Sequence, residues 1–138
     1  MGYATSEAAE EAFYSAFQQA DLDAMREIWA AHDSISCVHP QAEPLLGQDA
    51  VMQSWLEIFN GSVGVGIVAE PLASSVGANL AVHLVTEKLL DEQGRVNGVI
   101  VATNVFELTD DGWKMLLHHA SPQPADAAAA VPGAHQLH

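Results

Sequence analysis

The first half of the chain carries three stretches in which apolar residues recur at helical spacing. In residues 6–20 the apolar positions form one stripe, which predicts a helix that Thr5 or Ser6 can cap at its amino end. Asp21 is the predicted N-cap of a second, shorter helix, whose apolar residues also share one face. A third helix is predicted after Gly47, where bulky apolar residues again fall on one side. These stretches therefore predict a layer of three helices.

Between the second and third helices, residues 34–39 alternate between polar and apolar positions, which predicts a strand. The alternation places Ile35, Cys37 and His39 on the same face. His39 ends this run directly before Pro40. A histidine in that place either lies at a solvated strand end or points into a cavity, and the pattern favours the cavity.

The second half of the chain predicts a β-sheet. Its β-branched and apolar residues gather in four long runs at 64–74, 76–90, 97–108 and 113–121. These runs are apolar at nearly every position, which is typical of a sheet covered on both faces. Helices would cover one face and a second copy of the chain the other, so we predict a homodimer through the sheet. Residues 123–138 are rich in alanine and proline with no periodic apolar face, and they predict a flexible tail.

The composition fits a single domain over residues 1–122. Of the 138 residues, 49% are hydrophobic and 16% are charged, which excludes general disorder. The 18 acidic residues against 4 Lys and Arg give a formal net charge of −14, which would repel nucleic acid and an anionic membrane surface. One cysteine cannot form an internal disulfide, and no apolar run is long enough to span a bilayer. We therefore expect a cytoplasmic protein with neither a nucleic-acid nor a membrane partner.

Recognisable cofactor and metal motifs are absent from the sequence. The stretch GVGIVA at 64–69 resembles a dinucleotide fingerprint. However, a helix is predicted before it and a strand after it, which is the reverse of what that fingerprint needs. Seven histidines could suggest zinc, yet His118 and His119 are adjacent in a strand and point to opposite faces. We therefore predict no metal site and no cofactor.

The last predicted strand supplies a candidate histidine. If the lysine of this strand faces solvent, strand alternation places His118 on the outer face and His119 on the inner face. Taken alone, an inner histidine is more often a core residue bonded to a neighbour than a ligand contact. Asn104, in the preceding strand, raises the same two alternatives, as a buried hydrogen-bonding group or as a contact for a ligand. Trp29 and Trp55 are interpreted as core residues.

Three segments of the chain resemble a known family in order and spacing. They are AFQQADLDAMREIWA, VHPQAEPLLGQDAVMQSWLEIF and TNVFELTDDGWKMLLHHASP. On these segments, residues 7–122 resemble the SnoaL-like branch of the nuclear transport factor 2-like superfamily. The resemblance implies an α+β cone, in which a strongly bent antiparallel sheet wraps over three N-terminal helices around a pocket, and dimerisation through the sheet. The functions it implies range from isomerases, dehydratases, epoxide hydrolases and cyclases to non-catalytic binders.

Within this family, the ketosteroid isomerases place a general-base aspartate before a proline at this strand end. The resemblance puts His39 at that position, and histidine is a competent base near neutral pH. The oxyanion-donating tyrosine of the isomerases falls at Phe13, one residue before Tyr14. Glu87 and Glu107 are expected near strand ends, where water keeps them ionised. With these donors missing, we expect no appreciable ketosteroid isomerisation, since one lost donor costs about 3–4 kcal/mol of transition-state stabilisation.

Three functional hypotheses follow. The first is a largely apolar pocket that binds a small apolar or mixed-polarity molecule, with or without an enzymatic role. The second is a proton-transfer enzyme with His39 as general base, and the third is a dimerising interaction module with a vestigial pocket. The residues predicted to line or contact the pocket, besides His39, are Phe13, Tyr14, Phe17, Trp55, Asn104 and His119. A perturbed pKa of His39 beside an apolar cavity would favour the second hypothesis, and a collapsed pocket the third.

Overall fold

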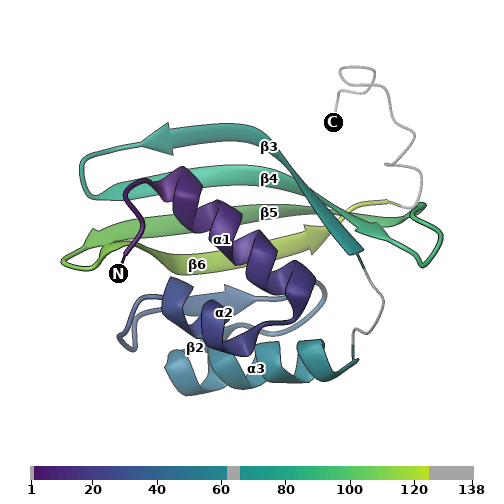
Figure 1. Ribbon diagram of the computed structural model, residues 1–138, viewed down its shortest axis with the longest axis horizontal. Coiled ribbons are helices and arrows are strands. Elements are labelled where there is room, and N and C mark those ends of the chain that lie inside the picture. The colour runs from purple at the N-terminus through teal and green to yellow at the C-terminus, as the bar shows by residue number, and fades with distance from the viewer. Residues whose placement is uncertain (1, 62–65, 125–138) are drawn as a thin grey trace.

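The computed structural model describes residues 2–61 and 66–124, and it has an α+β fold (Figure 1). The helices are α1 (Ser6–Gln19), α2 (Leu22–Ile28) and α3 (Gln48–Gly61). Thr5 caps α1, because its Oγ1 accepts a hydrogen bond from the Ala8 N–H at 3.0 Å. Asp21 caps α2 by accepting from the Ala24 N–H at 3.1 Å. All three helices thus begin where the sequence pattern placed them.

Six strands form one sheet in the order β2-β1-β6-β5-β4-β3. The strands are β1 (Ser36–Val38), β2 (Leu45–Leu46), β3 (Gly66–Val76), β4 (Leu80–Leu90), β5 (Val96–Thr109) and β6 (Gly112–Pro122). The four long strands pair antiparallel, whereas β1 pairs with β6 in parallel, so the sheet is mixed. The sequence did not predict β2, because a strand of two residues carries no alternation that a pattern can detect.

All three helices lie on one side of the sheet (Figure 1). α1 crosses the long strands, and α2 and α3 lie towards the edge formed by β1 and β2. This arrangement confirms the predicted fold class. It also places His39, directly after β1, between α3 and β6. The centroid of its ring is 4.8 Å from that of Trp55 and 6.4 Å from that of His118.

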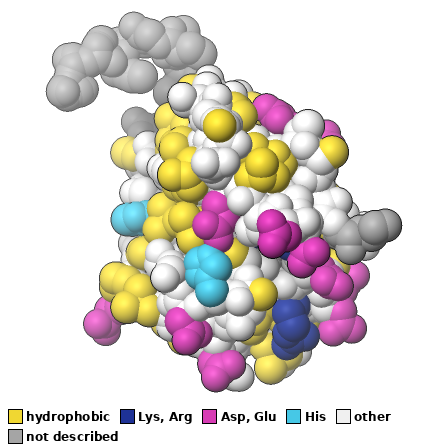
Figure 2. All heavy atoms as spheres, turned by 90° about the vertical axis from the view of Figure 1, so that its left-hand side faces the viewer, with side chains coloured by type: hydrophobic (Ala, Val, Ile, Leu, Met, Phe, Trp, Pro, Cys, Tyr) yellow, Lys and Arg dark blue, Asp and Glu magenta, His cyan; other side chains and the backbone are white. Residues whose placement is uncertain are grey.

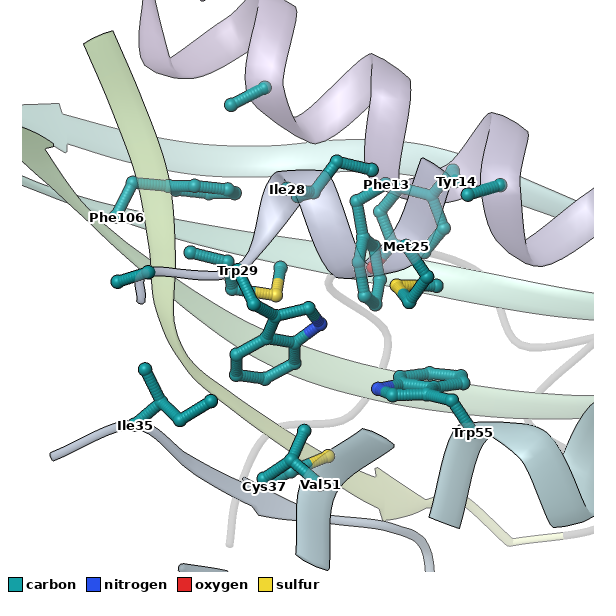
Figure 3. Packing of buried hydrophobic residues seen from close by; sticks show 14 of the residues in the cluster. Phe13, Tyr14, Met25, Ile28, Trp29, Ile35, Cys37, Val51, Trp55 and Phe106 are labelled. Atoms are coloured by element: carbon teal, nitrogen blue, oxygen red, sulfur yellow. The ribbon is translucent and has the colours of Figure 1, made fainter. Parts of the chain in front are cut away.

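The core fills the space between the helices and the inner face of the sheet (Figure 3). Phe13 of α1 packs edge-on against Tyr14 and Trp55, with ring centroids 4.8 and 5.5 Å apart. Trp29 and Trp55 are both buried, which confirms their interpretation as core residues. Truncating a buried aromatic residue such as Phe13 to alanine typically costs about 3–5 kcal/mol. These aromatic side chains therefore supply much of the energy that holds α1 and α3 on the sheet.

An irregularity in β6 changes which of its two adjacent histidines faces inward. The pairing with β5 shifts by one residue, so that Leu116 is an extra residue between Met115 and Leu117. One extra residue reverses the alternation of side chains beyond it. His118 is therefore 1% exposed on the inner face, whereas His119 is exposed on the outer face. The prediction that His119 faces inward is wrong, because strict alternation holds only in a strand without a bulge.

The outer face of the sheet is apolar near its centre. Val82 of β4 lies beside Val105 of β5, which in turn lies beside Leu117 of β6. Val82 is 45% exposed, and the other two side chains are half-buried. The helices lie on the opposite side of the sheet and do not cover this apolar row (Figure 1).

The remaining surface reflects the acidic composition. On the face drawn in Figure 2, Asp and Glu side chains are widespread, whereas Lys and Arg side chains are sparse. Among the described residues, no helix is both long enough and apolar enough to cross a membrane. The predicted tail at 123–138 lies outside the described residues from residue 125 onward, as does the start of the predicted strand at 64–74.

Candidate functional site

A cavity of about 400 Å³ lies between the sheet and the carboxyl-terminal ends of α1 and α3. The side chains that line it are Phe17, Gln18, Ala20, His39, Pro40, Ile58, Phe59, Ile67, Glu87, Leu89, Ile100 and His118. Most of this wall is apolar, and the titratable groups in it are His39, Glu87 and His118. A cavity of this size, with a few polar groups in an apolar wall, is typical of small-molecule sites.

The structure brings together most of the residues predicted for this site. Phe17 and His39 line the cavity directly. Four more residues form the buried layer behind it, and they are Phe13, Tyr14, Trp55 and Asn104. His119 lies on the other face of the sheet, and its neighbour His118 takes the place predicted for it.

His39 is fixed in one tautomer by its neighbour on α3. Its Nε2 lies 2.9 Å from Oγ of Ser54, and Ser54 donates its own proton to the carbonyl oxygen of Val51 at 2.6 Å. Because a hydroxyl group has one proton, we assign Nε2 of His39 as the donor to Ser54 and Nδ1 as a lone-pair acceptor. Burial lowers the pKa of His39, so its neutral ring predominates at pH 7.

Asn104, in the middle of β5, connects the buried polar groups behind the cavity. Its Nδ2 donates to Oε2 of Glu10 at 2.9 Å and to the hydroxyl group of Tyr14 at 3.0 Å. Its Oδ1 lies 2.6 Å from Nδ1 of His118. An amide oxygen can only accept, so His118 donates through Nδ1 and presents Nε2 as an acceptor. Asn104 is therefore a buried hydrogen-bonding group that orients a histidine of the cavity wall.

His118 and Glu87 meet at the cavity wall. Nε2 of His118 lies 4.0 Å from Oε2 of Glu87. Burial lowers the pKa of His118 to about 3, so this ring is neutral at pH 7. Tyr14 donates to Oε2 of Glu87 at 2.6 Å, whereas Oε1 has no hydrogen-bond partner within the described part of the chain. The wall thus presents an imidazole nitrogen and a carboxyl oxygen that are both free to contact a ligand.

Glu87 is buried, which corrects the expectation that water keeps it ionised. Its exposed fraction is 2%, because α1 covers this part of β4. Burial raises the pKa of Glu87 to about 7; the Tyr14 hydrogen bond opposes this shift and the charge of Glu10 adds to it. Glu107, in contrast, is partly exposed and pairs with His32 at the surface. Near pH 7 the Glu87 side chain therefore exchanges between a carboxylic acid and a carboxylate.

A second buried cluster contacts Asn104 from the other side. Nδ1 of His83 lies 3.0 Å from Oε1 of Glu10, and Nε2 of His83 lies 2.9 Å from Oγ of Ser6. This order of serine, histidine and carboxylate matches that of a nucleophilic triad. However, Ser6 is buried and does not line the cavity that Glu87 and His118 border, so its hydroxyl group does not face a substrate there. We interpret the cluster as a structural connection between α1 and β4.

Other reactive side chains add little chemistry at the cavity. Cys37 is buried beside His39, and burial raises the pKa of its thiol to about 12, so that the thiol stays protonated. Among the described residues, His, Cys, Asp and Glu side chains form no group of three or more that could hold a metal ion. Acid–base chemistry at this site therefore depends on His39, Glu87 and His118.

Sequence reasoning missed Glu87 and His118 as site residues. A signal for Glu87 was present, because the small or apolar residues Ala81 and Val85 share its face of β4 and are buried with it. No comparable signal marks His118. Its inward orientation depends on the bulge at Leu116, and the hydrophobic pattern of β6 does not reveal a bulge.

Comparisons with known proteins agree with this architecture. The family model described as a SnoaL-like domain matches residues 7–126. A structure from Thiobacillus denitrificans, provisionally described as a calcium/calmodulin-dependent protein kinase type II association domain, is 37% identical with a TM-score of 0.86, and the match covers 90% of this chain and 99% of that one. A second structure, from Streptomyces avermitilis, is provisionally described as a dehydratase of the nuclear transport factor 2-like family. It is 32% identical to this chain with a TM-score of 0.77, and the match covers 87% of this chain and 94% of that one.

A curated relative extends the comparison to plants. The F-box protein SKIP8 of Arabidopsis thaliana is 29% identical over 119 residues, which is 86% of this chain and 50% of that protein. The chain therefore spans half the length of this relative. A ketosteroid isomerase-like protein from Erwinia carotovora atroseptica shares the fold, with a TM-score of 0.69. It is 20% identical to this chain, and the match covers 86% of this chain and 94% of that one. The chain belongs to the SnoaL-like domain family, within the nuclear transport factor 2-like superfamily.

Proposed function

We propose that this protein binds a small, largely apolar molecule in the cavity beside α1 and α3. The observation that carries this proposal is the cavity itself, which measures about 400 Å³ and combines an apolar wall with three titratable groups. A cavity of this size forfeits dispersion contacts among the side chains that line it. A ligand that fills the cavity restores those contacts, and the polar groups fix its orientation.

Ligand-observed NMR with a library of small apolar fragments tests this proposal. Wild-type protein should bind fragments that carry one polar group. Ile58→Trp should weaken this binding at least tenfold, because Ile58 lines the cavity and an indole in its place would occupy the space. Leu56→Trp is the matched control on the same helix, since Leu56 is 37% exposed and does not line this cavity. Failure of every fragment to bind the wild type would overturn the proposal.

A second candidate function is proton transfer, which the protonation states at the cavity favour. His39 is neutral and presents a lone pair at Nδ1, so it can act as a base. Glu87 can act as an acid, because its pKa is about 7 and Tyr14 holds it in place. An acid and a base on one apolar wall are the groups that isomerase and dehydratase chemistry needs. The relative provisionally described as a dehydratase supports the same candidate.

Hydrogen–deuterium exchange at carbon tests this candidate with a simple ketone as the probe. The protein should catalyse deuterium incorporation next to the carbonyl group of 4-phenylbutan-2-one in D₂O, measured by NMR. His39→Ala should lower this rate at least tenfold, since removal of a positioned base typically costs a factor of about 10²–10⁴. His32→Ala, at a surface histidine, should leave the rate unchanged. An equal rate in wild type and His39→Ala would exclude His39 as the base.

We also propose that two copies associate through the outer face of the sheet. The row formed by Val82, Val105 and Leu117 is apolar, and burying such surface is favourable. Light scattering should give twice the monomer mass of 14.6 kDa, and Val82→Lys should give a monomer. Gln53→Lys, at an exposed position of α3, should remain a dimer.

The buried free thiol of Cys37 supports a reducing compartment, and we propose that the protein is located in the cytoplasm.

A further inference from the structure

The three titratable groups of the cavity are all hydrogen-bond acceptors when Glu87 is ionised. His118 presents Nε2, because Asn104 holds the proton on its Nδ1. Glu87 presents Oε1, and its Oε2 keeps one lone pair besides the one that accepts from a tyrosine hydroxyl. His39 is held by a serine in the same way and keeps a lone pair on Nδ1, which lies 3.9 Å from the sulfur of Cys37. Such a wall is complementary to a ligand group that donates several hydrogen bonds and accepts none.

The spacing of these acceptors suits one shared nitrogen atom. Nε2 of His118 lies 4.0 Å from Oε2 of Glu87, and this oxygen has a second lone pair besides the one that accepts from Tyr14. A donor nitrogen can therefore lie within about 2.7–2.9 Å of both groups at once, which is the usual length of a charge-assisted hydrogen bond. A primary ammonium group has three N–H donors and no acceptor, as in lysine. A hydroxyl group donates only once and would leave one of the two acceptors without a partner.

The charges around the cavity favour a cation over an anion. Among the described residues, neither lysine nor arginine lines the cavity, so a bound anion would meet Glu87 without a counter-ion. The rings of Phe17 and Phe59 do line it, with centroids 6.5 Å apart, and aromatic faces attract cations. The formal net charge of −14 acts in the same direction at long range, as the acidic surface in Figure 2 illustrates.

We propose that the cavity selects a primary amine with an apolar body, whose ammonium group donates hydrogen bonds to Glu87 and His118 while the body packs against Phe17 and Phe59. This inference rests on the proposed small-molecule function and narrows the class of ligand. A neutral alcohol of the same shape uses only one of the acceptors. A carboxylate of the same shape is repelled.

Amine binding and ionisation of Glu87 should be coupled. Burial raises the pKa of Glu87 to about 7, because the carboxylate lacks water, and a bound ammonium group compensates for that loss. The titratable groups that face Glu87 from the elements around it are Glu10 and Tyr14 of α1, Cys37 and His39 at β1, and His118 of β6. Burial keeps the two histidines neutral, and it keeps the tyrosine hydroxyl and the cysteine thiol protonated. Because Glu87 is mostly protonated at pH 6 and mostly ionised at pH 8, the amine should bind about tenfold more weakly at pH 6 than at pH 8.

Calorimetric titration with three probes of matched shape tests the inference. At pH 8, 4-phenylbutylamine should bind at least tenfold more tightly than 4-phenylbutan-1-ol, and 4-phenylbutanoate should not bind measurably. Glu87→Gln should reduce the preference for the amine over the alcohol to less than threefold. Glu92→Gln, at an exposed position in the turn after β4, is the matched control and should keep the wild-type preference.

A measurement on the wild-type protein covers the case in which Glu87→Gln fails to fold. At pH 6, binding of 4-phenylbutylamine should release close to one proton, measured in two buffers that differ in ionisation enthalpy. Release of no proton would overturn the inference. Equal affinity for the amine and the alcohol would also overturn it, while leaving small-molecule binding intact. If apolar fragments bind but none of the three probes does, only the proposal of amine selection is wrong. If the fragments do not bind either, the proposal of small-molecule binding is wrong as well.

Discussion

Two buried polar clusters flank Asn104, and both are built from a hydroxyl group, a carboxyl group and an imidazole. The closed cluster consists of Ser6, Glu10 and His83. The cavity cluster consists of Tyr14, Glu87 and His118. All six side chains are buried, and Asn104 contacts a member of each cluster. The two clusters differ in what lies beside them.

In the closed cluster, the hydrogen bonds are satisfied within the protein. Both oxygens of Glu10 and both ring nitrogens of His83 have polar neighbours within 3.0 Å. In the cavity cluster, Oε1 of Glu87 and Nε2 of His118 have no such partner among the described residues, and both residues line the cavity. Residue type alone therefore does not mark a site. Buried polar groups point to ligand binding where their hydrogen bonds remain incomplete beside a cavity.

Asn104 joins the two clusters through hydrogen bonds, but it does not transfer protons between them. Its Nδ2 donates to Glu10 on one side and to Tyr14 on the other. Both hydrogen bonds start from the same nitrogen, and a neutral amide does not pass a proton from one partner to the next. The closed cluster therefore acts on the protonation of Glu87 only through the charge of Glu10, which raises the pKa of Glu87. Substitutions in and around the two clusters can test this separation.

Removal of the shared residue should have the largest effect. Asn104→Leu removes one buried hydrogen-bond partner from each of Glu10, Tyr14 and His118, so the free energy of unfolding should fall by about 3–5 kcal/mol. Urea denaturation followed by circular dichroism measures this loss. Thr103→Val, at the neighbouring position on the outer face, is the control and should change stability by less than about 0.5 kcal/mol. A loss below about 1 kcal/mol in Asn104→Leu would show that the clusters do not depend on Asn104.

The pH dependence of stability should distinguish the cavity cluster from the rest of the protein. The pKa of Glu87 is about 7 in the folded chain against an ordinary value of 4.5, so between these pH values the folded chain holds a proton that the unfolded chain has released. This group therefore lowers the free energy of unfolding by about 3 kcal/mol as pH rises from 4.5 to 7. His118 acts in the opposite direction, because its pKa of about 3 lies below the ordinary 6.5 and the unfolded chain binds the proton first.

Glu87→Gln removes one of these two opposing effects. Relative to wild type, the variant should gain about 3 kcal/mol of stability as pH rises from about 4.5 to 7.5, because it no longer carries the ionisable group. Denaturation series at several pH values measure the difference between the two proteins. Thr103→Val should differ from wild type by a constant amount over this range. A pH-independent difference for Glu87→Gln would mean that Glu87 titrates near its ordinary value in the folded protein.

Local sequence patterns were sufficient to predict the helices and the long strands. The N-cap residues Thr5 and Asp21 and the helix start after Gly47 depend on interactions within a few residues of the chain. The apolar runs of β3 to β6 likewise carry their own signal. The parallel pairing of β1 with β6 depends on contacts between residues far apart in sequence, and no local pattern reports it.

The candidate site was predicted only in part for the same physical reason. His39 and Phe17 were found because each lies at a position that the local pattern or the family resemblance marks. His118 depends on a bulge at Leu116, and a bulge reflects how two strands pair. The burial of Glu87 depends on α1, which lies far away in sequence, as the Tyr14 hydrogen bond across 73 positions shows. Such long-range packing decides which polar groups lose contact with water.

Deletion of the hydroxyl group in the cavity cluster should have a moderate effect with a specific signature. Tyr14→Phe keeps the ring in place but removes the donor to Oε2 of Glu87, and this hydrogen bond lowers the pKa of Glu87. Without it, the pKa of Glu87 should rise, so affinity for 4-phenylbutylamine at pH 7 should fall several-fold. Stability should fall by about 1–2 kcal/mol. Calorimetric titration at pH 7 and at pH 9 provides the control, because the loss of affinity should shrink at the higher pH.

Deletion of the hydroxyl group in the closed cluster should have the smallest effect. Ser6→Ala removes the hydrogen bond between Oγ and Nε2 of His83 at 2.9 Å, which should cost about 1 kcal/mol of stability. Amine affinity should change by less than twofold, because Asn104 does not carry protons between the clusters. A several-fold change in affinity, comparable to that of Tyr14→Phe, would show that the hydroxyl group of Ser6 also influences amine binding at Glu87. Ser6→Ala and Tyr14→Phe each delete one hydroxyl group from α1, and only the Tyr14 hydroxyl donates to Glu87, so a larger loss of binding is expected for Tyr14→Phe.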